Sequence, residues 1–169
     1  MRAILLATRM TPTEAATGLF KTIPPPITVS QLEEYGVEVS ESTSNRIARE
    51  ILSLNLYWAL AAVDAHIPFT YRSAIKQALL EFIRREWWES GRFGAGTWDE
   101  YQSELHGRQE RYSHLVDREG ISHLGICAET ASLMEDEGII PTTDREKLLV
   151  LLIDYAPASE YGRLLDEAE

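Results

Sequence analysis

The sequence predicts an all-α fold: a single-domain bundle of five to six helices with an extended, proline-containing N-terminal segment. Two observations favour this class. Helix-capping patterns recur along the chain, and the apolar residues between them recur at spacings of three and four, as on one face of a helix. With 169 residues, of which 44% are hydrophobic, the chain can enclose a core of its own. We expect one domain overall, with an N-terminal segment over residues 1–43 and a bundle core over residues 44–169.

The N-terminal segment is predicted to strap across the bundle. A helix should begin after Thr11, where a capping threonine precedes a proline and a glutamate, and a short helix should follow Ser30. Between them, the three prolines within residues 23–27 require an extended polyproline II conformation, and the flanking isoleucines favour burial. Residues 3–7 could form a short strand, which is the main alternative within an otherwise helical fold.

The bundle core should contain two central helices. The first spans residues 44–66, ahead of Pro68, and is apolar over a wide arc. The second opens at Thr143 and contains the apolar run 148–153. A strand is the competing interpretation of that run, but its leucine content and capping pattern favour a helix. The remaining helices are expected at residues 70–90, 97–119 and 122–137, with a short one after Pro157.

Charge limits the classes of partner. The net charge is −11, and residues 93–169 carry all of it, with seventeen acids against six bases. Such a surface repels the phosphate backbone, so we expect no direct nucleic-acid binding, whereas a basic protein partner would suit it. Solubility alone is the simpler interpretation of the acidity.

The cysteine content and the apolar runs bear on location. The one cysteine, Cys127, cannot form an intramolecular disulfide, and the apolar run at the start is too short for a signal peptide. The longest apolar runs, residues 54–63 and 148–153, are far below the roughly 20 residues that a membrane-spanning helix requires. We therefore expect a cytoplasmic protein that does not bind a membrane.

Three of the four tryptophans fall within residues 87–98, together with three glycines. Because aromatic rings supply much of the apolar area of cores and interfaces, this segment is the best candidate for a binding site. On an α-helical wheel Trp88 lies opposite the apolar face, so the following glycine loop either covers it or leaves it for a partner, including a second copy of the chain. The candidate ligand- or partner-binding residues are Trp87, Trp88, Arg92, Phe93, Trp98 and Tyr101.

A run of three acids, Glu135, Asp136 and Glu137, stands at the predicted end of a helix. Negative charge at a helix C-terminus opposes the helix dipole. A basic partner or a cation could compensate the run, which makes it a candidate acidic partner surface, although solvent screening also suffices.

Histidine and acid residues recur within residues 97–119. His106, Glu110 and His114 are spaced to share one face of a helix, as metal ligands do. That face is polar and would lack a water-excluding pocket, so a solvated surface is the simpler interpretation. We expect no metal, no cofactor and no catalytic residue.

These observations favour a non-enzymatic accessory or protein-interaction module, which could also form a homodimer. The alternative is a small-molecule-binding domain, with Trp87, Phe93 and Trp98 around an apolar pocket and Arg92 fixing an anionic group. The less favoured alternative is a metal-dependent hydrolase that uses the three histidine and glutamate residues named above.

Overall fold

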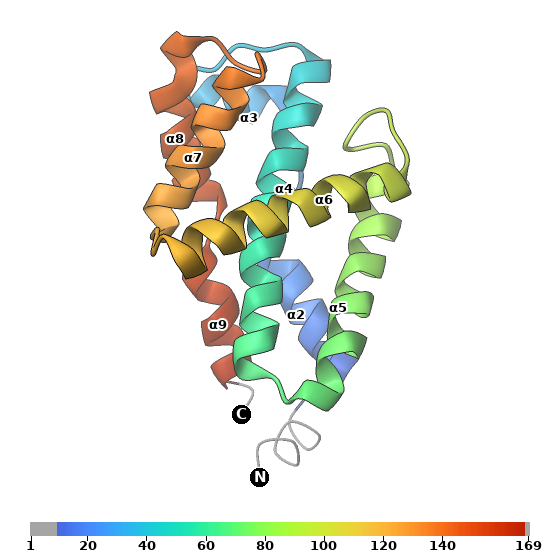
Figure 1. The fold of residues 1–169 in the computed structure, drawn as a ribbon. Helices are drawn as coiled ribbons and strands as arrows, with labels where there is room; N and C mark the ends of the chain where they lie inside the picture. Colours follow the sequence, from blue (N-terminus) through green and yellow to red (C-terminus); the bar gives the residue numbers. More distant parts are fainter. Residues whose placement is uncertain (1–9, 168–169) are drawn as a thin grey trace.

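The computed structural model describes residues 10–167, and every regular element in that range is a helix (Figure 1). The all-α class is therefore confirmed, while the alternative strand at residues 3–7 lies outside the described residues. The elements are α2 (Pro12–Thr22), α3 (Val29–Glu34), α4 (Glu41–His66), α5 (Phe69–Ile83), the π-helix η1 (Arg84–Trp88), α6 (Trp98–Ser113), the π-helix η2 (His114–Arg118), α7 (His123–Asp136), the 3-10 helix η3 (Thr142–Asp144), α8 (Arg145–Tyr155) and α9 (Ala158–Glu167).

Helix α4 is the axis of the bundle. It begins after Ser40, whose hydroxyl accepts a hydrogen bond from the amide of Thr43, and it ends ahead of Pro68. Most side chains of residues 47–63 are buried. In Figure 1 α4 runs the height of the molecule, and α6 crosses in front of it. The first expected central helix is present, and it starts about one turn earlier than its apolar pattern indicates.

The N-terminal segment contributes a helix to the bundle as well as an extended link. Ala15 and Leu19 of α2 are fully buried, and α2 packs along α5 and against α9. Ile23 and Ile27, on either side of the prolines, are buried as expected. Because α2 belongs to the bundle, the helices of the described chain exceed the expected five to six.

Helix α8 lies at the periphery beside α7, and this corrects the expectation of a second central helix (Figure 1). The apolar run forms a helix and not a strand, yet only its leucines 148, 151 and 152 are buried. Val150 is 54% exposed and Ile153 is 39% exposed. A helix that is apolar on every side is fully buried only if other elements surround it. The sequence does not show how many elements pack around a helix.

Within residues 10–167 no helix is long and apolar enough to cross a membrane. The longest, α4, has 26 residues, but its sequence includes Arg46, Arg49, Glu50 and Asp64. These charged side chains need partners or water, and two of them, Arg49 and Glu50, organise the contacts between α4 and α6.

A buried amide joins α4 to the C-terminal helices. The Nδ2 group of Asn55 donates hydrogen bonds to the carbonyl oxygens of Ile51 (3.0 Å) and Tyr155 (2.8 Å). The Tyr161 hydroxyl donates a hydrogen bond to Asn55 Oδ1 (2.7 Å), and both side chains are fully buried. Since a buried polar group without a partner is costly, this amide holds the end of α8 and the middle of α9 on α4.

We predict that Asn55→Ala lowers the free energy of unfolding by about 3 kcal/mol, because it leaves the Tyr155 carbonyl and the Tyr161 hydroxyl buried without partners. Tyr161→Phe is the milder change and should cost about 1 kcal/mol, since it removes a single hydrogen bond. Urea unfolding followed by circular dichroism measures both values. Equal losses in the two variants would contradict the role given to the amide.

Candidate functional site

The end of α5 turns two adjacent tryptophans in different directions. Residues Arg84–Trp88 form η1, in which backbone hydrogen bonds join residues five apart instead of four. Trp87 is buried and packs on Phe20 of α2, with ring centroids 4.5 Å apart. Trp88 instead packs on residues of α6. The π turn therefore places Trp88 against the bundle, which corrects the α-helical wheel that put it on the opposite side.

Trp88, Phe93, Trp98 and Tyr101 form a cluster of four rings, which we call the aromatic corner. The centroid of the Trp88 ring lies 5.5 Å from that of Phe93, 5.5 Å from Trp98 and 5.1 Å from Tyr101. Phe93 and Tyr101 are buried, and Trp88 is half-buried. The structure thus brings together four of the six predicted site residues. These contacts also reduce the exposed surface of Trp88 that a second copy of the chain could contact.

The other two predicted site residues lie elsewhere. Trp87 packs toward α2. Trp88, and not Trp87 as expected, lies beside Phe93 and Trp98. Arg92 is exposed on the loop. Trp87 therefore points away from Phe93 and Trp98, because neighbouring residues of a helix point in directions roughly 100° apart.

The glycine loop, residues 91–96, is held against α4. Gly94 has φ +81°, and a Cβ atom at this position would lie 2.7 Å from the side-chain nitrogen of Asn45, so the backbone and the close approach both require glycine. Arg49 of α4 donates hydrogen bonds from Nη1 to the carbonyl oxygens of Phe93 and Ala95, each 3.4 Å long. These contacts from one helix hold the loop over the aromatic corner.

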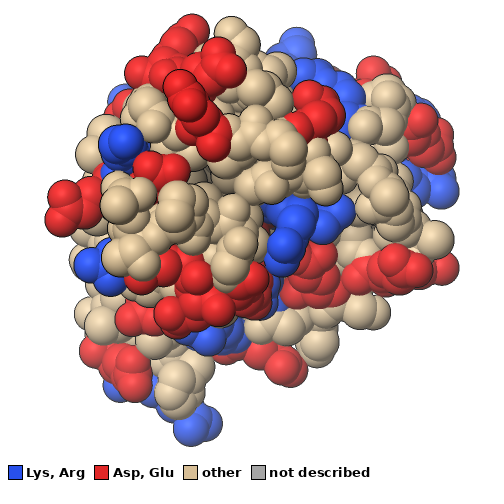
Figure 2. Space-filling view, turned by 90° about the horizontal axis from the view of Figure 1, so that it is seen from above, with Lys and Arg blue, Asp and Glu red and all other residues tan. Residues whose placement is uncertain are grey.

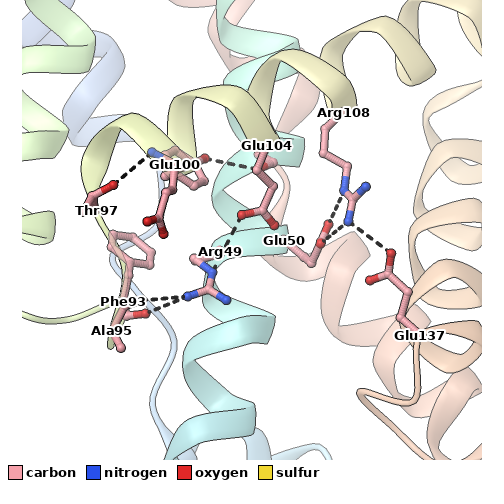
Figure 3. Close-up of polar contacts among 11 residues, drawn as sticks. Arg49, Glu50, Phe93, Ala95, Thr97, Glu100, Glu104, Arg108 and Glu137 are labelled. Atoms are coloured by element: carbon pink, nitrogen blue, oxygen red, sulfur yellow. Dashed lines mark hydrogen bonds and ion pairs between the residues drawn. The ribbon is translucent and has the colours of Figure 1, made fainter.

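Arg49 and Glu50 are the only charged residues within residues 47–63 of the sequence. Glu50 is 3% exposed and accepts two hydrogen bonds from Arg108 of α6, of 3.0 Å from Nε and 2.7 Å from Nη2. Arg108 also lies 3.5 Å from Glu137, beyond the end of α7. Figure 3 shows this chain of ion pairs running from α4 through α6 to the end of α7.

Arg49 points toward α6 beside this network (Figure 3). Its Nε atom is buried and has no hydrogen-bond acceptor among the described residues, and Oε2 of Glu104 is 3.9 Å away. Burial and the nearby Glu50 carboxylate raise the pKa of Glu104, while Arg49 acts to lower it. A hollow of about 150 Å³, which we call the Arg49 pocket, is lined by Arg49, Trp88, Glu100, Tyr101, Glu104 and the Ala95–Thr97 backbone region.

Sequence reasoning missed Arg49 and Glu104 as site residues. The available signal was the pair Arg49–Glu50 inside an otherwise apolar stretch of the central helix. Buried charges require paired charges or hydrogen bonds, so such a pair predicts a polar partner on a neighbouring helix. It does not show which helix supplies that partner.

The acidic run at the end of α7 is compensated largely within the chain. An oxygen of Glu135 lies 3.5 Å from Arg145, and one of Glu137 lies 3.5 Å from Arg108, while Asp136 is exposed. Figure 2 shows Asp and Glu side chains interleaved with Lys and Arg over the face seen from above. Two arginines of the same chain thus offset part of this charge, while Oε2 of Glu135 is buried without a hydrogen-bond partner among the described residues.

His106 and His114 are exposed on α6 and η2, and each lies near a different acid. His106 Nε2 is 3.2 Å from Glu110 Oε1, and His114 Nε2 is 3.9 Å from Glu119 Oε1. Over residues 10–167, no group of three or more His, Cys, Asp or Glu side chains is placed to hold a metal ion. His106, Glu110 and His114 nevertheless line one open surface groove of about 540 Å³, together with Asp117 and Arg118.

A second groove of about 540 Å³ opens where α4, α5 and the α6–η2 segment meet, and sequence reasoning did not find it. We call it the three-helix groove. Its apolar floor is formed by Tyr57, Leu60 and Ala61 of α4 and Leu80 of α5. Helix α5 packs chiefly on α2, while α6 crosses α4 (Figure 1). The groove depends on how helices cross, and no local sequence pattern encodes that.

We predict that Glu104 makes stability depend on pH. Folding raises the pKa of Glu104 above its ordinary value of 4.5, so ionisation of this group opposes folding. Below the ordinary pKa the group is protonated in both states and costs no stability, but the free energy of unfolding falls as the pH rises through the raised pKa. Glu104→Gln cannot ionise, so this fall is absent from the variant. The free energy of unfolding of the variant relative to wild type should therefore increase from about pH 4 to about pH 7.

Urea unfolding at several pH values measures this difference. Glu146→Gln, at an exposed position of α8, removes one carboxyl group elsewhere and corrects for the change in net charge. A slope for Glu104→Gln no greater than that of Glu146→Gln, or a slope of opposite sign, would contradict the prediction.

The two hollows lie along the same helix. The Arg49 pocket adjoins the N-terminal half of α6, and the three-helix groove adjoins its C-terminal end and η2. No family model, no curated protein and no solved structure matches this chain, so both candidate sites are interpreted from their geometry.

Proposed function

We propose that this chain is a non-enzymatic interaction domain that receives a basic segment of a partner protein in the three-helix groove. The observation that carries the proposal is the combination of an apolar floor with carboxylates at the rim. The volume of about 540 Å³ is within the usual range of protein binding pockets. The groove is thus large enough to receive side chains of a partner.

The floor suits the hydrocarbon part of a lysine or arginine side chain. Leu60 and Leu80 offer aliphatic surface from two helices, and Tyr57 offers an aromatic ring. Lysine and arginine bury their methylene groups along apolar surface while the charged end stays in water. A nearby aromatic face adds attraction for the cation. One basic side chain of a partner can therefore contact the floor and the rim together.

The rim carries two carboxylates and one lysine, so its charge is negative on balance. Asp64 of α4 lies at the rim, where it pairs with Lys76 of α5 at 2.7 Å, and Asp117 of η2 is exposed. Burial and the Asp117 carboxylate both raise the pKa of Tyr57, so this carboxylate is close enough to act on the floor. The net charge of −11 adds long-range attraction that speeds the encounter with a basic partner.

Other partners suit the surface less well. A nucleic acid would meet repulsion from the excess of carboxylates, because its binding depends on clustered lysine and arginine. We place the domain in the cytoplasm, since its single cysteine, Cys127, is a buried free thiol, as is usual in reducing compartments.

The proposal predicts that short peptides combining lysine or arginine with leucine bind the groove, and that peptides of the same length with glutamate in place of the basic residues do not. Amide chemical-shift mapping by NMR locates the site, and a titration measures the dissociation constant. The double variant Asp64→Asn/Asp117→Asn should weaken binding about tenfold, because each rim carboxylate contributes on the order of 0.5–1 kcal/mol.

The double variant Asp136→Asn/Glu146→Gln is the matched control. It also removes two negative charges, but from exposed positions of α7 and α8. Because Asp136 belongs to the acidic run, this variant also tests the run as the partner surface. Equal weakening by both double variants would show that general acidity attracts the peptide. That outcome, or shifts centred on α7, would overturn the assignment to the groove.

A further inference from the structure

The Arg49 pocket presents opposite charges across a small space. Arg49 lies on the α4 side, while Glu100 and Glu104 lie on the α6 side. Trp88 and Tyr101 provide aromatic walls. The pocket shares no lining residue with the three-helix groove, so a ligand bound here would contact other residues than a partner bound in the groove.

Arg49 lacks strong acceptors for its hydrogen bonds. A guanidinium group carries five N–H donors, yet here Nε is buried without an acceptor among the described residues, and Nη1 is shared between two carbonyl oxygens at 3.4 Å. The Glu104 oxygen at 3.9 Å from Nε is beyond hydrogen-bond distance. A buried charged donor without an acceptor is costly. Because Nε is inaccessible to solvent, a ligand carboxylate in the pocket would reach the guanidinium group through its Nη atoms, whose donors are only partly used by the two long bonds to carbonyl oxygens.

An anion alone does not suit the other side. A simple carboxylate would face Glu100 and Glu104, and Glu104 is already affected by the Glu50 carboxylate. A simple cation would meet these acids and the aromatic walls favourably, but it would be repelled by Arg49. A ligand with both charges satisfies both sides of the pocket.

We infer that the Arg49 pocket binds a small zwitterion of the α-amino-acid class. Its carboxylate would accept hydrogen bonds from Arg49, and its ammonium group would face Glu100 and Glu104 beside the rings of Trp88 and Tyr101. The volume of about 150 Å³ equals that of roughly five water molecules. Glycine, alanine and serine fit within this volume, whereas the side chains of leucine and tryptophan would extend beyond it.

The glycine loop forms part of the rim and sets the size limit. Ala95 and Gly96 line the pocket, and the loop is held by the Arg49 hydrogen bonds and by the close approach of Gly94 to Asn45. A loop fixed in this way cannot make room for a large side chain without losing those contacts. The predicted specificity for small side chains therefore has a structural cause.

The test uses the full chain, labelled with ¹⁵N, and follows its backbone amides and indole N–H signals by NMR. Glycine and alanine should shift the signals of Trp88 and of the loop. Acetate and methylammonium each carry one of the two charges, and they should bind at least about tenfold more weakly, because each loses one charged contact. Leucine should also bind at least about tenfold more weakly, because of its size.

Variants identify the charged groups. Arg49→Lys keeps the charge but loses the planar fork of donors, so it should weaken glycine binding about tenfold or more. Arg92→Lys is the matched control, because Arg92 is exposed on the glycine loop and does not line the pocket, and it should leave binding unchanged. Glu100→Gln, at an exposed position, should also weaken binding, and it serves as the test if Arg49→Lys does not fold.

Three results would overturn the inference. The first is no shift with glycine or alanine at tens of millimolar, which would mean that water alone fills the pocket. The second is binding of acetate as strong as that of glycine, which would indicate a site for anions. The third is weakening by Arg92→Lys but not by Arg49→Lys or Glu100→Gln, which would place the ligand at the outer surface of the loop.

Discussion

The need to pair two charges in the middle of α4 determines how the neighbouring helices pack. The middle of this helix is enclosed, and a buried carboxylate such as Glu50 is strongly destabilising unless it is paired. Arg108 meets this requirement with two hydrogen bonds, and therefore fixes the point at which α6 crosses α4. Glu137 extends the pairing to the end of α7. The arrangement is thus specified by charge pairing as well as by apolar burial.

The crossing of α6 over α4 creates both candidate sites. Toward the N-terminal end of α6, the helix brings Glu104 opposite Arg49 and closes the aromatic corner with Tyr101. Toward its C-terminal end, the helix diverges from α5 and leaves the three-helix groove. Each site combines apolar or aromatic surface with carboxylates, which is why both are assigned to ligands with positive charge.

The sequence was sufficient for the fold class and for several helix starts, because capping is local chemistry. Thr11 and Thr97 each accept a hydrogen bond from the amide three residues later, as their patterns predict, and Ser122 does the same at the start of α7. The pattern at Ser30 was placed two residues late, since Thr28 is the residue that forms the capping box with Gln31. Neighbouring hydroxyl residues compete for that role, and local spacing does not decide between them.

The candidate site was predictable only in part, and the reasons are geometric. Aromatic clustering identified Trp88, Phe93, Trp98 and Tyr101, because large rings close together in the chain tend to pack together. Glu104 was missed because it reaches Arg49 only after two helices cross. The run in α8 was assigned to the centre because composition shows how apolar a helix is, but not how many neighbours surround it.

The π turn at the end of α5 sets the direction of Trp88 through its backbone hydrogen bonds. Successive residues of an α-helix are rotated by about 100° around its axis, whereas the wider π turn fits five residues into roughly the angle that four span in an α-helix. The same five residues in α-helical spacing would turn the indole away from α6 by about the angle of one residue. Removing one residue and restoring α-helical spacing would instead leave the following side chains pointing as they do here, so a related chain that is one residue shorter in this segment could still form the aromatic corner.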